Sequence, residues 1–187
     1  IFSQPNWSAI LVPASSPVTE VAQLKGKKIA ATKGTDPYFF LLQSLEEAGL
    51  TPADVTIENL QHSDGKAALE SGQVDAWAGL DPLLSTSVAT AGSKIIYDNI
   101  DFNSYGFLNA TESFVTAHPD VAQVVVNAYE KARQFALENP EEAVAILAEV
   151  AAIDPAIATT TLTERTNLEV DPIPGKDQRA VLEIVGP

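Results

Sequence analysis

The sequence of this 187-residue chain predicts an α/β fold, and the prediction rests on two observations. Short apolar runs alternate with helical stretches over residues 8–97, and a glycine or a proline separates most of them. Hydrophobic residues make up 45% of the sequence, which is enough to bury one full core. Alternating strands and helices of this length favour a largely parallel sheet that helices cover on both faces.

Five apolar runs in the first half of the chain predict the strands of this sheet. They lie at residues 8–13, 27–32, 55–60, 74–80 and 94–97. Helices are expected between the later runs, because apolar residues recur there at helical spacing and a glycine follows each stretch. The glycines that end these helices are Gly49, Gly72 and Gly92.

The second half of the chain is predicted to be mostly helical, up to the final Pro187. A proline marks the start of three of these helices, at His118-Pro119, Asn139-Pro140 and Asp154-Pro155. The first of the three carries its apolar residues on one face. That face consists of Val121, Val124, Val125, Ala128, Ala132 and Phe135.

Asp36 and Asp81 each follow closely on a predicted strand and precede a proline. Proline suits the first helical position and pushes the residue before it out of the helical region, so both aspartates are expected as helix N-caps. The same positions lie at the carboxyl edge of the predicted sheet, where open α/β sheets bind ligands. Gly34 would let the backbone approach a small anion there. Trp77 would add an aromatic wall if it faces the crevice, and is otherwise a core residue.

Charge and composition argue against several functional classes. Eleven basic and 25 acidic residues give a formal net charge of −14, which would repel nucleic acid and anionic membranes. No window approaches the apolar run needed to cross a bilayer, so direct membrane insertion is not expected. The absence of cysteine rules out disulfides and thiolate metal sites, and the scattered acidic residues predict neither a metal site nor a cofactor. A chain that begins at Ile1 and lacks methionine predicts a preceding segment.

No catalytic residue is predicted. No cysteine is present to act as a nucleophile, and His62 and His118 have no neighbours at a catalytic spacing. His62 comes just after a strand that reaches the same sheet edge, so it could line a cleft, although a solvated loop residue is the favoured interpretation. His118 simply precedes a helix proline.

Residues 24–84 contain a series of recognisable motifs, namely "LKGKK", the Lys-Gly-Thr turn, "EAGLTPADV", "ALESGQVDAW" and the Asp-Pro after the tryptophan. With these motifs the stretch resembles the periplasmic substrate-binding proteins of ABC importers for aliphatic sulfonates, taurine and nitrate. The resemblance continues on both sides, with "SAILVP" before this stretch and "FVTAHPDV" after it in the family's order.

This resemblance implies a type II periplasmic-binding fold, in which two α/β lobes clamp the ligand between them. Residues 1–13 would be the first crossing strand, 14–104 a complete second lobe with a mainly parallel sheet, and 105–109 the second crossing segment. Residues 110–187 would be the helical part of a first, incomplete lobe. The family begins with a stretch that builds most of that lobe and half of the cleft.

The resemblance also implies where the ligand binds. Lys33, Gly34 and Thr35 match the family's ligand-facing loop, and Trp77 and Asp81 match its tryptophan and the aspartate of its Asp-Pro. One departure follows the loop, where relatives often have a small polar residue and then a histidine. This chain has Asp36-Pro37-Tyr38 instead, and Asp36 and Tyr38 are added to the expected binding residues.

A carboxylate at Asp36 would already occupy the positive end of the helix, where a second negative charge is unfavourable. Together with Asp81 it would suit a ligand with an amine, or with several hydroxyl or N–H donors, such as a zwitterion or a heterocycle. A bare sulfonate is the less favoured ligand on this hypothesis.

The family resemblance implies an extracytoplasmic, bacterial location and a monomer that delivers its ligand to an ABC permease, with a lipid anchor upstream as one arrangement. Two alternatives share the fold. One is an effector or sensor domain of a regulator or receptor, and the other is an enzyme such as a desulfinase or a pyrimidine-precursor synthase. Function cannot be read from the fold alone, so the sequence leaves both open.

Overall fold

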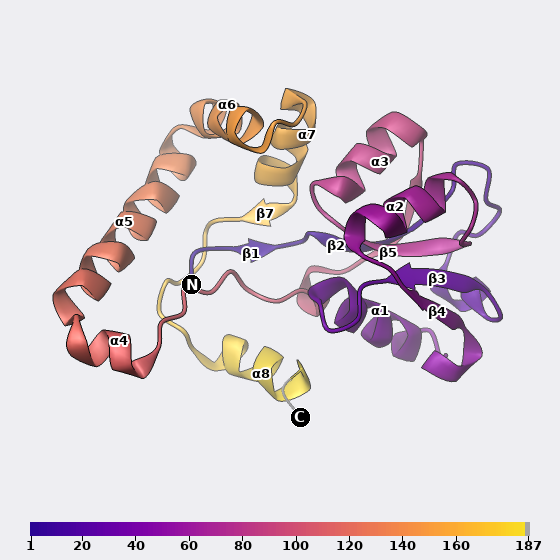
Figure 1. Cartoon of the computed structure of the whole chain (residues 1–187), viewed down its shortest axis with the longest axis horizontal. Helices are drawn as coiled ribbons and strands as arrows, with labels where there is room; N and C mark the ends of the chain where they lie inside the picture. The colour runs from indigo at the N-terminus through magenta and orange to yellow at the C-terminus, as the bar shows by residue number, and fades with distance from the viewer. Residues whose placement is uncertain (186–187) are drawn as a thin grey trace. The chain divides into compact units, whose positions relative to one another are not determined.

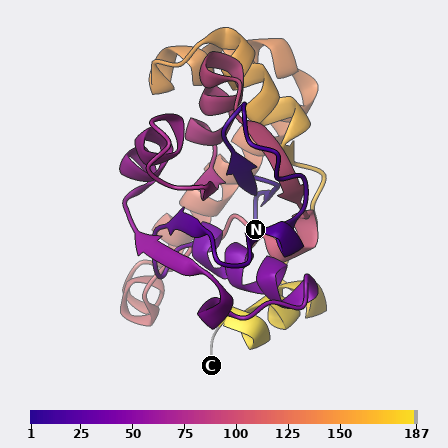
Figure 2. The same cartoon turned by 90° about the vertical axis from the view of Figure 1, so that its right-hand side faces the viewer.

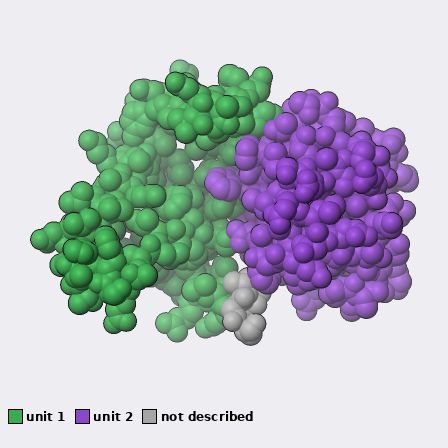
Figure 3. Space-filling view, in the orientation of Figure 1, with its two compact units in different colours: residues 1–5, 104–187 green, residues 6–103 purple. Residues whose placement is uncertain are grey.

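The structure is a computed structural model in which residues 1–185 are described. It contains two compact units (Figure 3). Unit 1 consists of Ile1–Pro5 and Ser104–Pro187, and unit 2 of Asn6–Asn103. The chain therefore leaves and re-enters unit 1, and unit 2 is one continuous stretch.

Unit 2 is built on a five-stranded sheet with the order β4-β3-β5-β2-β6. β3 pairs in parallel with both β4 and β5, while β2 is antiparallel to its two neighbours. Four of the five strands thus run in the same direction, which confirms the prediction of a mainly parallel sheet. The strands are β2 (Ser8–Val12), β3 (Lys28–Ala31), β4 (Thr56–Asn59), β5 (Ala76–Leu80) and β6 (Lys94–Asp98).

Helices cover both faces of this sheet, with α1 on one face and α2 and α3 on the other (Figures 1 and 2). Side chains alternate between the faces along each strand. In β2, Ile10 therefore packs in the core layer that holds Phe40 of α1, whereas Leu11 packs with Leu84 of α3. The helices of unit 2 are α1 (Asp36–Glu47), α2 (His62–Glu70), α3 (Leu83–Ala91) and the short 3-10 helices η1 (Val21–Leu24), η2 (Pro52–Asp54) and η3 (Ile100–Phe102).

The three predicted helix ends are confirmed. Gly92 is the C-cap of α3 with φ of 68°, in the left-handed region that favours glycine. The predicted start of α1 is wrong by one residue. Its N-cap is the extended Thr35, and Asp36 is already the first helical residue, with Pro37 second.

Unit 1 is mostly helical and holds a two-stranded antiparallel sheet of β1 (Gln4–Pro5) and β7 (Thr166–Asn167) (Figure 1). The helices expected after His118, Asn139 and Asp154 are all present. The short α4 was not expected from the sequence, and the predicted end at Pro187 lies outside the described residues. The helical elements are α4 (Glu112–Ala117), α5 (Pro119–Glu138), α6 (Pro140–Ala151), α7 (Pro155–Thr159), the π-helical turn η4 (Thr160–Glu164) and α8 (Lys176–Val185).

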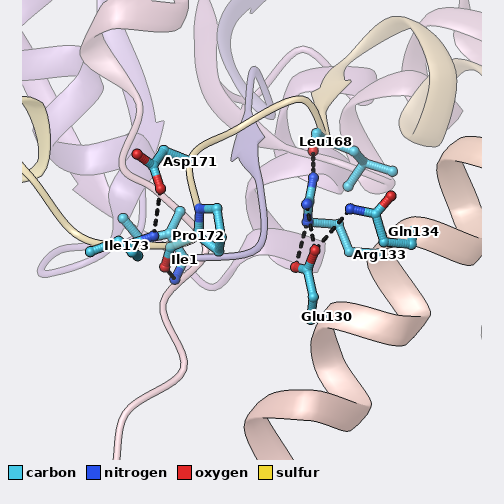
Figure 4. A network of polar contacts seen from close by, with 8 residues as sticks. All are labelled: Ile1, Glu130, Arg133, Gln134, Leu168, Asp171, Pro172 and Ile173. Carbon is cyan, nitrogen blue, oxygen red and sulfur yellow. Dashed lines mark hydrogen bonds and ion pairs between the residues drawn. The ribbon is translucent and has the colours of Figure 1, made fainter.

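Arg133 ties α5 to the segment that follows β7 (Figure 4). Its Nε and Nη2 donate to the two carboxylate oxygens of Glu130, at 2.9 and 2.7 Å, and its Nη1 donates to the Leu168 carbonyl at 2.6 Å. The amino group of Ile1 donates to the Pro172 carbonyl at 3.0 Å, so the start of the chain is held to the same segment.

The apolar face of α5 is present as predicted, but it is not covered. None of the residues of this helix is buried, and the side chain of Val124 is 66% exposed. Val121, Val126 and Tyr129 are exposed on the same helix. Among the described residues, no helix is both long enough and apolar enough to span a membrane.

Trp77 fills the core layer between the sheet and α2, and two glycines make room for it. A Cβ at Gly65 would lie 2.8 Å from Trp77 Nε1, and one at Gly79 would lie 2.9 Å from its ring. Such distances are too short for a real Cβ contact, so the indole requires glycine at both positions.

Gly65→Ala is expected to lower the free energy of unfolding by about 1–3 kcal/mol, because the new methyl group must displace a buried indole. In an ordinary helix interior the same substitution raises stability, so the sign itself is diagnostic. Urea denaturation of the wild type, Gly65→Ala and the exposed control Ser63→Ala measures the effect. An unchanged or more stable Gly65→Ala protein would contradict this packing.

Glu130 supplies a pH-dependent part of the stability of unit 1. Its hydrogen bonds from Arg133, and then from Gln134, lower its pKa from 4.5 to about 2. A carboxyl group whose pKa is lowered on folding stabilises the protein fully above pH 4.5 and loses that contribution as the pH falls towards 2.

Glu130→Gln should therefore destabilise the protein at pH 7, and the difference from the wild type should shrink at pH 3. Chemical unfolding of both proteins at the two pH values gives this difference directly. A difference that stays constant with pH would show that the charge of Glu130 does not stabilise the fold.

Candidate functional site

The carboxyl ends of β3, β4 and β5 meet at one edge of the sheet in unit 2. Ala31 and Asn59, the last residues of β3 and β4, are paired in register. The loop that follows each strand leads into a helix, so the N-termini of α1, α2 and α3 all begin at this edge. The candidate site is the set of side chains on these three loops.

The loop between β3 and α1 is held by hydrogen bonds. The Lys33 backbone N–H donates to Asn59 Oδ1 at 3.0 Å, and Thr35 Oγ1 donates to the Thr32 carbonyl at 2.6 Å. Gly34 lies between them with φ of 78°. A Cβ there would meet open space, so the backbone conformation, and not crowding, favours glycine.

Asp36 and Tyr38 follow in the first turn of α1. Asp36 is exposed and lies where the helix dipole favours negative charge. Tyr38 is half-buried and packs against the core layer of α1, with its ring centroid 5.9 Å from that of Phe39. Part of the Tyr38 ring is therefore in contact with other residues of unit 2.

Trp77 and Asp81 belong to β5 and the turn after it. Trp77 is only 1% exposed and packs with Leu11, Leu69 and Leu84, so the structure places it in the core of unit 2. Asp81 is 5% exposed. Its Oδ1 accepts from the Ser85 N–H of α3 at 2.9 Å, so its side chain bonds to the first turn of the helix. The N-cap position itself is held by Pro82, and the prediction that Asp81 is the N-cap is wrong by one residue.

His62 is a residue of this edge that the sequence interpretation placed wrongly. It is not in a loop but is the first residue of α2, half-buried, with Nδ1 3.3 Å from Thr32 Oγ1. Thr32 Oγ1 also donates to the Leu60 carbonyl at 2.6 Å. Parallel pairing of the strands that end before Thr32 and Leu60 is the signal that would have brought these residues together.

The arrangement provides one cation at Lys33, two carboxylates at Asp36 and Asp81, a histidine, and backbone N–H groups at helix starts. Helix N-termini favour small anions, and the carboxylates favour a ligand with hydrogen-bond donors. Within the described part of the chain, no three His, Asp or Glu side chains are grouped so as to hold a metal ion.

The hydrogen bond that Asp81 accepts from α3 can be separated from its charge. Asp81→Ala removes the acceptor of a buried N–H and is expected to cost about 1–2 kcal/mol of unfolding free energy. Asp81→Asn retains Oδ1 and should cost less than half as much. Thermal and urea unfolding compare the two with Asp154→Ala, which removes a similar bond to the Ala156 N–H in unit 1. Equal losses in Asp81→Asn and Asp81→Ala would show that charge, and not this hydrogen bond, matters at this position.

Several curated and solved proteins that are similar to this chain are named as sulfonate-binding proteins. A relative from Escherichia coli (strain K12), named for binding aliphatic sulfonates, is 30% identical over 171 residues, which are 91% of this chain and 54% of the relative. The chain thus spans about half the length of this curated relative.

Solved structures show the same likeness. The periplasmic aliphatic sulphonate binding protein SsuA from Escherichia coli superposes with a TM-score of 0.86 at 28% identity, covering 97% of this chain and 59% of that chain. The alkanesulfonate-binding protein SsuA from Xanthomonas axonopodis pv. citri, bound to MOPS, gives 0.85 at 30% identity, covering 96% and 63%. A desulfurization enzyme matches at 17% identity with a TM-score of 0.73, and this shows a shared fold alone.

These proteins share the periplasmic-binding fold, so the fold predicted from the sequence is confirmed. The pattern of the NMT1/THI5-like proteins matches residues 2–143, which is most of the sequence. The chain belongs to the NMT1/THI5-like family, and the proteins similar to it include a periplasmic aliphatic sulphonate binding protein.

Proposed function

We propose that this chain is part of an extracytoplasmic solute-binding protein that captures a small sulfonate and delivers it to an ABC permease. The observation that carries the proposal is the loop of Lys33, Gly34 and Thr35 at the carboxyl end of β3, which leads directly into α1. A lysine and a helix N-terminus together favour an anionic head group. The sulfonate-binding relatives supply the chemical class of that group.

The two carboxylates narrow the ligand class further. Asp36 is exposed in the first turn of α1, beside the proposed position of the sulfonate. A carboxylate there repels a bare anion but binds an ammonium or N–H group on the same ligand. The proposed ligand is therefore a sulfonate that also carries a hydrogen-bond donor, such as an aminosulfonate.

Asp36, Asp81 and Lys33 are proposed as the charged residues around the ligand, with Gly34, Thr35 and Tyr38 beside them. Trp77 has a supporting role in this proposal, because it is buried on β5, the strand that leads into the turn of Asp81. In the proposed mechanism the ligand stabilises a closed form of two lobes, and the closed form of the monomer docks on the permease.

The lobes of this proposal follow the sequence expectation, in which residues 14–104 form one lobe and 110–187 part of the other. The exposed apolar face of α5 supports it, since such a face is normally covered by other protein. The solved relatives contain chain outside the matched region, and we infer that equivalent protein covers α5 in the functional molecule.

A binding function is favoured over an enzyme because the similar relatives are named as binding proteins. An upstream lipid anchor is one way in which such a protein would be held at the membrane. Mass spectrometry of the protein isolated from its source cells tests this arrangement, since a lipidated start would add the mass of its acyl chains.

Calorimetric titration with 2-aminoethanesulfonate and ethanesulfonate tests the ligand class. The aminosulfonate should bind more tightly, and Asp36→Asn should weaken its binding about tenfold, the effect of losing one charged hydrogen bond of roughly 1.4 kcal/mol. Ethanesulfonate should bind Asp36→Asn at least as well as the wild type, because a repulsive charge is removed.

Asp120→Asn is the matched control, since Asp120 also lies in the first turn of a helix but in unit 1. Its affinities should equal those of the wild type. Tighter binding of ethanesulfonate than of the aminosulfonate, unchanged by Asp36→Asn, would refute the proposed ligand class.

A further inference from the structure

The hydrogen bonds of Thr32 fix the position of the proton on the His62 ring. Thr32 is 7% exposed, and its hydroxyl lies 2.6 Å from the Leu60 carbonyl and 3.3 Å from His62 Nδ1. A hydroxyl group has one hydrogen, and a carbonyl oxygen can only accept. The hydroxyl must therefore donate to Leu60, so its oxygen can only accept from His62.

His62 consequently carries its hydrogen on Nδ1, and the neutral ring presents Nε2 as an acceptor. Among the described residues, the contact with Thr32 is the one hydrogen bond that the structure gives this ring. The ring is half-buried, and among the described residues its Nε2 is not one of the buried side-chain atoms that lack a hydrogen bond. Because the contact with Thr32 orients the ring, Nε2 is suited to accept a hydrogen bond from an N–H or O–H group of a ligand.

The elements around His62 place this residue at the same sheet edge as the candidate site. Ala31 and Asn59 are paired in register, and the Lys33 N–H donates to Asn59 Oδ1 at 3.0 Å. The loop that opens α1 and the first turn of α2 therefore share one sheet edge. The charged groups on the neighbouring elements are Lys33, Asp36, Glu58, Asp64, Lys66 and Asp81.

We propose that His62 is a specificity-determining residue whose Nε2 accepts a hydrogen bond from the N–H group of the bound ligand. This inference rests on the proposed function, because it assigns a further residue to the same ligand. With Asp36, His62 provides a second acceptor for the N–H group of the ligand. The site then selects an aminosulfonate over a bare alkanesulfonate.

The proton position is tested without any ligand. Long-range ¹H–¹⁵N NMR spectra of histidine-labelled protein, at a pH where the rings are neutral, distinguish a protonated from an unprotonated ring nitrogen. The spectrum of His62→Asn assigns the signals. We expect hydrogen on Nδ1 and none on Nε2, and the opposite tautomer would overturn the proposal.

The role in binding is tested by two substitutions that each imitate one ring nitrogen. The amide of His62→Asn can occupy the position of Nδ1 and keep the contact with Thr32, whereas that of His62→Gln reaches the position of Nε2. The ratio of 2-aminoethanesulfonate to ethanesulfonate affinity should fall about tenfold in His62→Asn, because a hydrogen bond to a charged group is lost. In His62→Gln the ratio should be largely retained.

The control is His118→Asn, which removes the exposed histidine before α5 in unit 1 and should leave the ratio unchanged. Unfolding temperatures of all variants show whether each is folded. A wild type that binds both probes, with an unchanged ratio in folded His62→Asn, would overturn the role of His62 alone. A wild type that binds neither probe would refute the proposed function, and the role of His62 with it.

Discussion

The parallel pairing of β3 with β4 and β5 is the constraint on which the rest of unit 2 depends. Parallel strands end at the same edge, so three loops and three helix starts that are far apart in sequence become neighbours. The register is specified by burial, because a shift of one residue would turn Ile29 and Trp77 onto the wrong faces. The position of every side chain at the candidate site follows from that register.

Much of this arrangement could be predicted from the sequence. Apolar runs, and the glycines that follow helices, located the strands and helices of unit 2. Both signals are local, because the spacing of apolar residues and the positions of turns can be read within a short stretch of sequence. The contact of Thr32 with His62 was not predicted, because it depends on which strands pair and in which register. The short α4 was missed because six residues carry little helical periodicity. The one-residue error at Asp36 arose because proline was assumed to occupy the first position of α1, where it is second.

Trp77 belongs to a sequence motif of the candidate site, but its side chain does not form part of the surface of that site. Its place before an Asp-Pro suggested an aromatic wall, yet the alternation of β5 turns it into the layer beneath α2. The glycines that make room for it lie on α2 and on β5 itself. The indole therefore fixes the spacing between this strand and helix, and with it the positions of His62 at the start of α2 and of Asp81 after β5.

Hydrogen bonds within the protein join the loops at this edge to one another. Backbone and side-chain hydrogen bonds fix Lys33 to Asn59 and Thr32 to Leu60, and the Asp81 N–H donates to the Trp7 carbonyl at 3.1 Å. Groups that are already ordered lose little entropy when a ligand binds. An imidazole held by Thr32 cannot turn away from a ligand that lacks a donor, and its Nε2 then penalises that ligand. For the ligand class proposed above, discrimination between two sulfonates of similar size is therefore expected to depend on the rigidity of the edge as much as on its charges.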